Sequence, residues 1–165
     1  PSSLFLENKL IERIDVISSD EMFDHTSKLF KDCDIAILSA AVSDFKPKKA
    51  EKNKIKKENL KKIALNLIPT IDILKSLGDQ KTDQILIGFA LETENAMKNA
   101  INKIKQKNLD AIVLNNLNHK GAGFNSDTNK ITFINKNNDY THYKLKTKDN
   151  VSIDIFDQIL NMIHE

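Results

Sequence analysis

The sequence predicts an α/β fold in which a mainly parallel sheet is flanked by helices. Three short apolar runs, at residues 35–38, 85–89 and 111–114, have the composition of strands that are buried on both faces. Between the last two runs, residues 94–107 carry apolar side chains at helical spacing. A strand, a helix and a second strand in this order form a βαβ unit, and the two strands of such a unit are parallel.

Shorter patterns predict the other helices. Ser19 is the expected cap of a first helix that runs through Leu29. Pro69-Thr70 opens a short helix that Gly78 is expected to end. Thr93 is the expected cap of the crossover helix, and residues 151–163 form a closing amphipathic helix.

The same patterns place the outer strands. Residues 14–17 read as a short strand, and residues 63–67 alternate like a half-exposed one. Residues 131–134 and 140–145 are expected to pair as a hairpin. Residues 46–57 have no apolar periodicity and are the one stretch that looks flexible.

Composition limits the class of protein. At 165 residues and 40% hydrophobic, the chain has the size of one domain, residues 1–165. One cysteine, Cys33, excludes an intrachain disulfide, and no apolar run resembles a signal peptide or a membrane span, so we expect a cytoplasmic protein that does not bind a membrane. The net charge of +2 does not indicate a nucleic acid partner, although nine lysines and two glutamates give residues 46–62 a local charge of +7.

The segments that follow the buried strands are the candidate ligand site, because ligands of open parallel sheets bind at the carboxyl ends of the strands. After the first strand, the small residues Ser39 and Ala40 let a flat ring approach the backbone, and Asp44 is a possible acceptor for a base or ribose. Phe89 could stack on a base. The chain has four glycines and neither G-x-G-x-x-G nor a Walker A loop, so any nucleotide is bound without a glycine cradle of this chain's own.

Three lysines and one helix start are candidates for binding phosphate. Lys54 lies in the basic segment, and Lys103 and Lys107 lie four residues apart on the crossover helix. The predicted helix at Pro69, Thr70, Ile71 and Asp72 could present free backbone amides. The four histidines have no metal-ligand spacing, so no metal site in the protein is predicted. Cys33 has no neighbouring cation and is expected to be structural.

Each of these features also has an ordinary structural interpretation. The basic segment could be a solvated charge run, the two helix lysines a solvent face, and Phe89 a core residue. Two other functions stay open at this point. One is a nicotinamide-dependent oxidoreductase with a similar sheet, and the other is a module that binds RNA or acidic partners through residues 46–62, although few aromatic residues accompany those lysines.

Five motifs in register resemble bacterial phosphopantothenoylcysteine synthetase. They are A-A-V-x-D-F at residues 40–45, K-I-K-K at 54–57, G-F-A-x-E-T at 88–93, K-N-L-D at 107–110 and G-F-N-S-D-x-N at 123–129. The resemblance spans nearly the whole chain and implies a Rossmann-like fold with a small hairpin extension that serves dimerisation. It implies a ligase of coenzyme A biosynthesis that joins 4'-phosphopantothenate and cysteine through an acyl-cytidylate formed from CTP with Mg²⁺.

The resemblance also implies roles for single residues. Backbone at Ser39 and Ala40 would hold cytidine together with Asp44, beside Phe89. Lys54 would be the catalytic lysine and, with Lys103 and Lys107, would neutralise the triphosphate. A nucleotide pocket would include the residues from Pro69 to Asp72.

The chain departs from the family pattern in two ways. Its sequence lacks the glycine-rich first strand-helix unit of the family, and Thr70 stands where many relatives have Asp. The resemblance further implies a homodimer, and fusion to or association with a flavin-dependent phosphopantothenoylcysteine decarboxylase.

Overall fold

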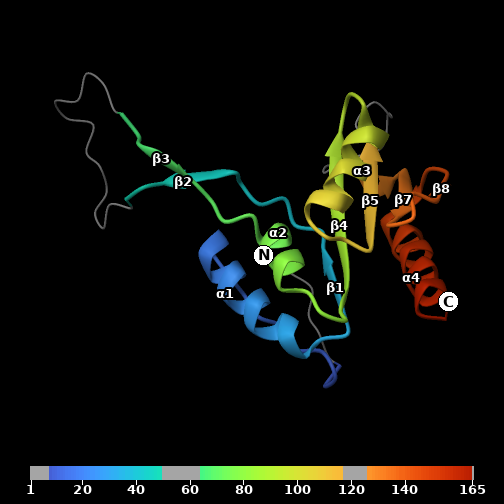
Figure 1. Cartoon of the computed structure of the whole chain (residues 1–165), viewed down its shortest axis with the longest axis horizontal. Coiled ribbons are helices and arrows are strands. Elements are labelled where there is room, and N and C mark those ends of the chain that lie inside the picture. Colours follow the sequence, from blue (N-terminus) through green and yellow to red (C-terminus); the bar gives the residue numbers. More distant parts are fainter. Residues whose placement is uncertain (1–7, 50–63, 117–125, 165) are drawn as a thin grey trace.

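The computed structural model describes residues 8–49, 64–116 and 126–164, and these residues form a mixed α/β fold of the Rossmann-like kind (Figure 1). A five-stranded sheet has the order β1-β4-β5-β7-β8. Its strands are β1 (Ile35–Leu38), β4 (Ile85–Glu92), β5 (Ala111–Asn116), β7 (Ile131–Asn135) and β8 (Tyr140–His142). The pairs β1–β4 and β4–β5 are parallel, whereas β5–β7 and β7–β8 are antiparallel.

Helices cover both faces of this sheet. On one face, α2 (Ile73–Gln80) and α3 (Ala96–Gln106) bury Leu77 and Ile104 against the strands, and α1 (Ser19–Leu29) adds the partly buried Phe23. A short 3-10 turn, η1 (Phe30–Asp32), follows α1 on the same face. The long C-terminal helix α4 (Lys148–His164) packs Ile155 against the opposite face.

A two-stranded ribbon extends away from the sheet. It pairs β2 (Phe45–Pro47) with β3 (Leu67–Pro69) in antiparallel register, and it is the small hairpin extension beyond the Rossmann-like core (Figure 1). Another short ribbon, β6 (Thr128–Asn129) with β9 (Lys146–Thr147), lies next to the start of α4.

The predicted βαβ unit is confirmed as β4, α3 and β5. The predicted cap Thr93 is wrong, because Asn95, in a left-handed conformation, is the N-cap of α3. The predicted cap Ser19 is instead the first residue of α1, and Ser18 caps the helix through a capping box with Glu21.

Two expected features in the first half of the chain differ. Residues 14–17 form no strand, since no described strand lies in register beside them. The strand predicted at 63–67 shares only Leu67 with the observed β3, at Leu67–Pro69. Residues 64–66 lie in no strand, and residue 63 lies outside the described residues. Burial of β1 is only partial because β1 is an edge strand of the described sheet.

Gly78 does not end α2 as predicted. It lies inside the helix, where a Cβ would stand 1.8 Å from the carbonyl oxygen of Lys107. Asn108 also donates its side-chain amide to the Gly78 carbonyl at 2.9 Å. Close approach of α2 to the end of α3, rather than helix termination, therefore requires this glycine.

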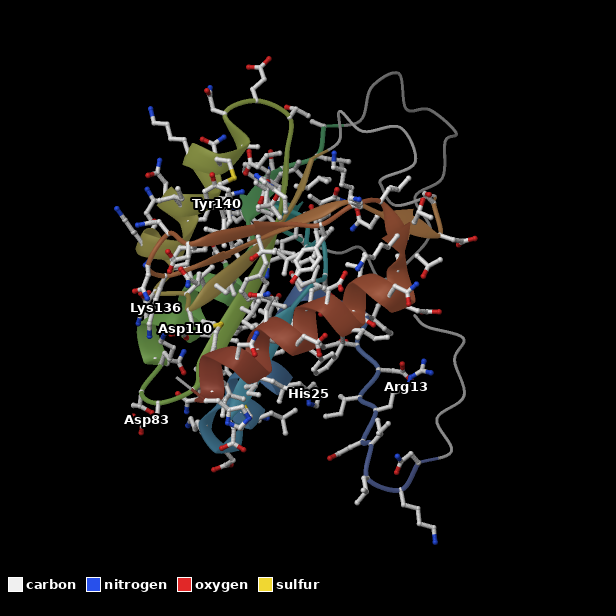
Figure 2. The ribbon with its side chains drawn as sticks, turned by 90° about the vertical axis from the view of Figure 1, so that its right-hand side faces the viewer. Arg13, His25, Asp83, Asp110, Lys136 and Tyr140 are labelled. Carbon is white, nitrogen blue, oxygen red and sulfur yellow. The ribbon has the colours of Figure 1, made fainter. Side chains whose placement is uncertain are left out.

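Asp110 joins three segments at the amino-terminal edge of β5. Its carboxylate accepts from Lys136 at 3.2 Å (Figure 2). It also accepts from Lys81 at 2.8 Å and from the Leu86 amide at 2.9 Å. Burial by itself raises the pKa of Asp110, but these hydrogen bonds and the charge of Lys81 outweigh it and hold the pKa below its ordinary value.

Within the described residues, no helix is long and apolar enough to cross a membrane.

Candidate functional site

A pocket of about 210 Å³ lies at the carboxyl ends of β1 and β4. We call it the strand-end pocket. Its wall includes Ala40 and Asp44 after β1, Asp72 before α2, Phe89 in β4 and Lys107 after α3. The rest of the wall is formed by Met22, Leu38, Val42, Ser43, Thr70, Ile71, Ile73 and Leu74. This is the position that the topology of an open parallel sheet favours for a ligand.

Hydrogen bonds from Thr70 to two backbone carbonyls hold two walls of the pocket together. The Thr70 amide donates to the Asp44 carbonyl at 2.9 Å, and the Thr70 hydroxyl donates to the Ser43 carbonyl at 2.5 Å. Phe45 and Pro69 are also paired, as residues of the β2–β3 ribbon. The segment after β1 and the segment before α2 are thereby fixed side by side, although they lie far apart in the sequence. Thr70 thus has a structural role in this wall.

Asp72 and Lys107 form an ion pair in the pocket, with 2.8 Å between the carboxylate and the ammonium. Asp72 is also the N-cap of α2, because its side chain accepts from the Lys75 amide at 3.0 Å. Burial alone raises the pKa of Asp72, but the hydrogen bonds from Lys107 and Lys75 and the charges of both lysines hold it below its ordinary value. The pocket therefore contains a carboxylate at neutral pH.

Lys103 lies apart from the strand-end pocket. Its ammonium pairs with Glu92 at 2.5 Å, and Asn99 donates to the same carboxylate at 3.0 Å. Burial raises the pKa of Glu92, but the hydrogen bonds from Lys103 and Asn99, with the charge of Lys103, bring it below its ordinary value. Lys103 and Lys107 thus pair with different carboxylates, and their joint binding of one ligand stays a prediction.

The remaining predicted residues divide into three groups. Ala40, Asp44, Phe89, Lys107 and the residues from Thr70 to Asp72 share the pocket wall. Ser39 and Pro69 adjoin this wall along the chain without lining it. Lys54, the predicted catalytic lysine, lies outside the described residues, as does most of the stretch at 46–57 that looked flexible.

Sequence reasoning missed Met22 and Leu74 as wall residues. Both read as ordinary apolar positions of amphipathic helices, and only their packing beside the strand ends shows that they reach a pocket.

Cys33 behaves as expected. Burial raises the pKa of its thiol, and Asp34 and Asp32 raise it further, so the thiol is not activated.

The wall contains groups suited to a polar ring. Asp44 and Asp72 can accept hydrogen bonds from hydroxyl or amino groups, and Phe89 offers an aromatic surface. Lys107 is the one cation in the described wall, and it is already paired. Within the described residues, no group of three or more His, Cys, Asp or Glu side chains could hold a metal ion.

Comparison with known proteins shows similarity over nearly the whole chain. A family model described as "DNA/pantothenate metabolism flavoprotein C-terminal domain" matches residues 2–163. A curated prokaryotic protein named "Cysteine/Cysteine sulfinic acid decarboxylase" is 46% identical over 99% of this chain and 46% of its own length. The coenzyme A biosynthesis bifunctional protein CoaBC of Bacillus subtilis is 40% identical over 96% of this chain and 39% of its own length.

Solved structures show the same fold. The crystal structure of the C-terminal domain of a coenzyme A biosynthesis bifunctional protein CoaBC has a TM-score of 0.74 and is 32% identical, with 92% of this chain and 65% of that chain covered. A DNA/pantothenate metabolism flavoprotein from Streptococcus pneumoniae has a TM-score of 0.71 at 19% identity, over 89% of this chain and 71% of that one. This chain therefore spans less than half the length of these curated relatives.

These names contradict the ligase identity that the motifs implied. The matching family is named as a flavoprotein C-terminal domain and one relative as a decarboxylase, and these names contradict the implied phosphopantothenoylcysteine synthetase. The acyl-cytidylate reaction, with CTP and Mg²⁺, is contradicted with it. The resemblance implied four partners, which were CTP, 4'-phosphopantothenate, cysteine and a second copy of the chain. They followed from the ligase identity and are contradicted with it. Coenzyme A biosynthesis is part of the printed names of two of these relatives.

A flavoprotein name implies flavin mononucleotide, but the described strand-end pocket does not fit it. Its volume of about 210 Å³ lies below the ~300–1,000 Å³ typical of pockets that enclose drug-sized ligands. A three-ring flavin with its phosphate side chain is of that larger class. The described wall suits a smaller, nucleoside-sized group.

Proposed function

Since the chain belongs to the DNA/pantothenate metabolism flavoprotein C-terminal domain family, we propose that it is part of a cytoplasmic coenzyme A biosynthesis enzyme. The overall activity we propose is decarboxylation of a cysteine-derived substrate. Support comes from the relatives, which are named as a decarboxylase and as bifunctional coenzyme A biosynthesis proteins. The flavin of such an enzyme is bound outside the strand-end pocket, because the pocket is too small for it.

This chain's own contribution is the binding of a nucleotide-like ligand in the strand-end pocket. One observation carries the proposal: Asp44, Asp72 and Lys107 converge beside Phe89 at the strand ends. Phe89 contacts the ring, and the two carboxylates accept hydrogen bonds from ribose hydroxyls or ring amino groups. Ser39, Pro69 and the residues from Thr70 to Asp72 shape the backbone around the ligand.

Lys107 binds the phosphate by exchange of partners. Its ammonium is held at 2.8 Å from Asp72, so an entering phosphate competes with that carboxylate for the same cation. Asp72 is then free to accept from the ligand while it continues to cap α2. Of the remaining predicted phosphate ligands, Lys54 stays a prediction, and Lys103 would have to leave Glu92 to reach the pocket.

Ligand titration tests the pocket. Calorimetry with ribonucleoside 5'-monophosphates, the matching nucleosides, riboflavin and flavin mononucleotide separates ring, sugar and phosphate contributions. We expect a nucleoside monophosphate to bind more tightly than its nucleoside, and Lys107→Gln to remove about 1.5–3 kcal/mol, the value of a hydrogen bond to a charged group. Lys105→Gln, two residues earlier in the last turn of α3 and absent from the described wall, is the matched control.

Each outcome has a distinct meaning. If no nucleoside or nucleotide binds at millimolar concentration, the pocket assignment fails. If flavin mononucleotide binds and Lys107→Gln abolishes its binding, the size argument fails. The activity is tested separately, by release of carbon dioxide from a cysteinyl carboxylate substrate with flavin supplied, and absence of release overturns the decarboxylase proposal.

A further inference from the structure

A second hollow, of about 390 Å³, lies on the face of the sheet that α3 covers, far along the strand order from β1. We call it the lateral pocket. Ala96 and Met97 of α3, Leu114 of β5, and Lys130, Thr132 and His142 line it. Its volume falls within the ~300–1,000 Å³ of ordinary small-molecule sites.

Strand register explains why these side chains meet. Thr132 in β7 pairs with Leu114 in β5 on one side and with His142 in β8 on the other. Directly paired residues project from the same face of a sheet, so the three side chains form a row across three strands. Leu114 belongs to the apolar cluster beneath α3, which places the row at the edge of that helix.

The histidine of this row is fixed in position. The Thr132 hydroxyl lies 2.8 Å from Nδ1 of His142, and the Tyr140 ring is tilted against the imidazole at a centroid distance of 5.0 Å. The other ring nitrogen, Nε2, is not in contact with the Thr132 hydroxyl. When Thr132 donates to Nδ1, the neutral imidazole carries its proton on Nε2, which is then a hydrogen-bond donor.

Charge distinguishes the lateral pocket from the strand-end pocket. Lys130 contributes a positive charge, and no carboxylate is among the described residues that line the hollow. Within the described parts of the chain, the Lys130 ammonium has no ion pair. Met97 and Leu114 add apolar surface beside these two polar groups. A ligand that fits has an anionic head for Lys130 and His142 and an apolar body for Met97 and Leu114.

We propose that the lateral pocket binds a small molecule in which a phosphate or carboxylate is attached to a short aliphatic body. The oxyanion accepts from Lys130 and from Nε2 of His142, as charged acceptors do in proteins. The aliphatic part covers Met97 and Leu114 and removes their surface from water. This site is separate from the strand-end pocket, and the two pockets share no lining residue.

Four probes test the proposal by two-dimensional NMR of the 165-residue chain. n-Butyl phosphate and butyrate carry both parts of the ligand, inorganic phosphate carries only charge, and n-butanol only the apolar body. We expect one of the two complete probes to shift the Met97 methyl and His142 ring signals together. Its dissociation constant should be at least tenfold lower than those of inorganic phosphate and butanol. The tighter of the two complete probes identifies the head group.

Substitutions locate the site. Lys130→Gln should weaken the better probe about tenfold, which corresponds to about 1.4 kcal/mol. Lys98→Gln, an exposed lysine of α3 that does not line the hollow, should leave the affinity unchanged. The proposal is overturned if Lys130→Gln binds as the wild type does, or if no probe shifts the Met97 and His142 signals. Equal binding of inorganic phosphate would show a charged surface rather than this pocket.

Discussion

Two aspartate–lysine ion pairs mark the two ends of α2, and they differ in burial. Asp72 caps the start of the helix and pairs with Lys107, and its side chain is 47% exposed. Lys81 follows the helix and pairs with Asp110, and these two side chains are only 10% and 9% exposed. One end of α2 is therefore locked by a buried ion pair, while the other presents an accessible ion pair to a pocket.

Burial determines what each pair can do. A buried pair with further hydrogen bonds cannot lose a partner without leaving an uncompensated charge inside the protein. An accessible pair is hydrated and weak, so either partner can turn to a ligand at little cost. The same chemistry thus serves as a structural anchor at one end of α2 and as a binding site at the other. Four predictions test this comparison, from the largest expected effect to the smallest.

Removal of the buried anchor should have the largest effect. Asp110→Ala leaves Lys81 and the Leu86 amide without their acceptor, and we expect a loss of about 3–5 kcal/mol in the free energy of unfolding. Urea unfolding followed by circular dichroism measures it. Asp79→Ala, which removes the exposed pair with Lys75, is the control and should cost no more than about 1 kcal/mol. Equal losses in the two variants would show that burial of the pair does not matter.

Contact between α2 and the end of α3 is tested at Gly78. An alanine there normally favours a helix by about 1 kcal/mol, but its Cβ would meet the Lys107 carbonyl at 1.8 Å. We expect Gly78→Ala to destabilise the chain by about 1–3 kcal/mol, the usual cost of overpacking. It should also shift the NMR signals of the Asp72–Lys107 pair. A stabilised Gly78→Ala variant would contradict the close approach.

Loss of the accessible pair should cost less stability. Asp72→Ala removes the N-cap of α2 and should lower the free energy of unfolding by about 1 kcal/mol. Asp72→Asn keeps a capping oxygen and should be nearly neutral. Nucleotide binding separates the capping role of Asp72 from its role in the exchange with the ligand phosphate. Asp72→Asn keeps the cap, but both variants lose the carboxylate that takes part in the exchange. A cost for Asp72→Ala as large as that for Asp110→Ala would remove the distinction between the two ends of α2.

Lowering the pH should have the smallest effect on the free energy of unfolding. Both aspartates have folded-state pKa values below their unfolded value of about 3.9, so each stabilises the chain above that pH and ceases to do so as pH falls through its folded pKa. The free energies of unfolding of Asp110→Asn and the wild type should therefore differ at pH 7 and approach each other below about pH 4. The difference between Asp72→Asn and the wild type should be smaller, and added salt should reduce it further, since the Asp72 side chain is half exposed. Urea unfolding across pH 3–7 measures both.

Local patterns in the sequence predicted most of the fold. Continuous apolar runs became β1, β4 and β5, and helical spacing of apolar side chains became α3 and α4. These patterns predict well because each element needs only its own periodicity to be recognised. Positions after the strands also pointed to Ala40, Asp44 and Phe89, since parallel topology alone brings strand ends together.

Partners distant in the sequence could not be predicted in this way. Lys103 and Lys107 look alike on one helix, yet one pairs with Glu92 and the other with Asp72. Gly78 reads as a helix end, and only its approach to the Lys107 carbonyl shows otherwise. Asp110 is the last residue of the K-N-L-D motif, one of the five that carry the family resemblance, but in the structure it is the acceptor of a buried ion pair. Short motifs also implied an activity that the comparisons contradict, because an activity depends on the whole site and on the rest of the protein.

By itself, then, the sequence determined the α/β class, the βαβ unit and the strand ends at which a ligand site would lie. Hydrophobic periodicity and turn chemistry are local, and they act on each segment before the chain has folded. Tertiary structure alone decided which lysine meets which carboxylate, and which of these pairs is buried. Ion pairing and burial depend on distances between segments, and those distances exist only after α2 and α3 have packed on the sheet.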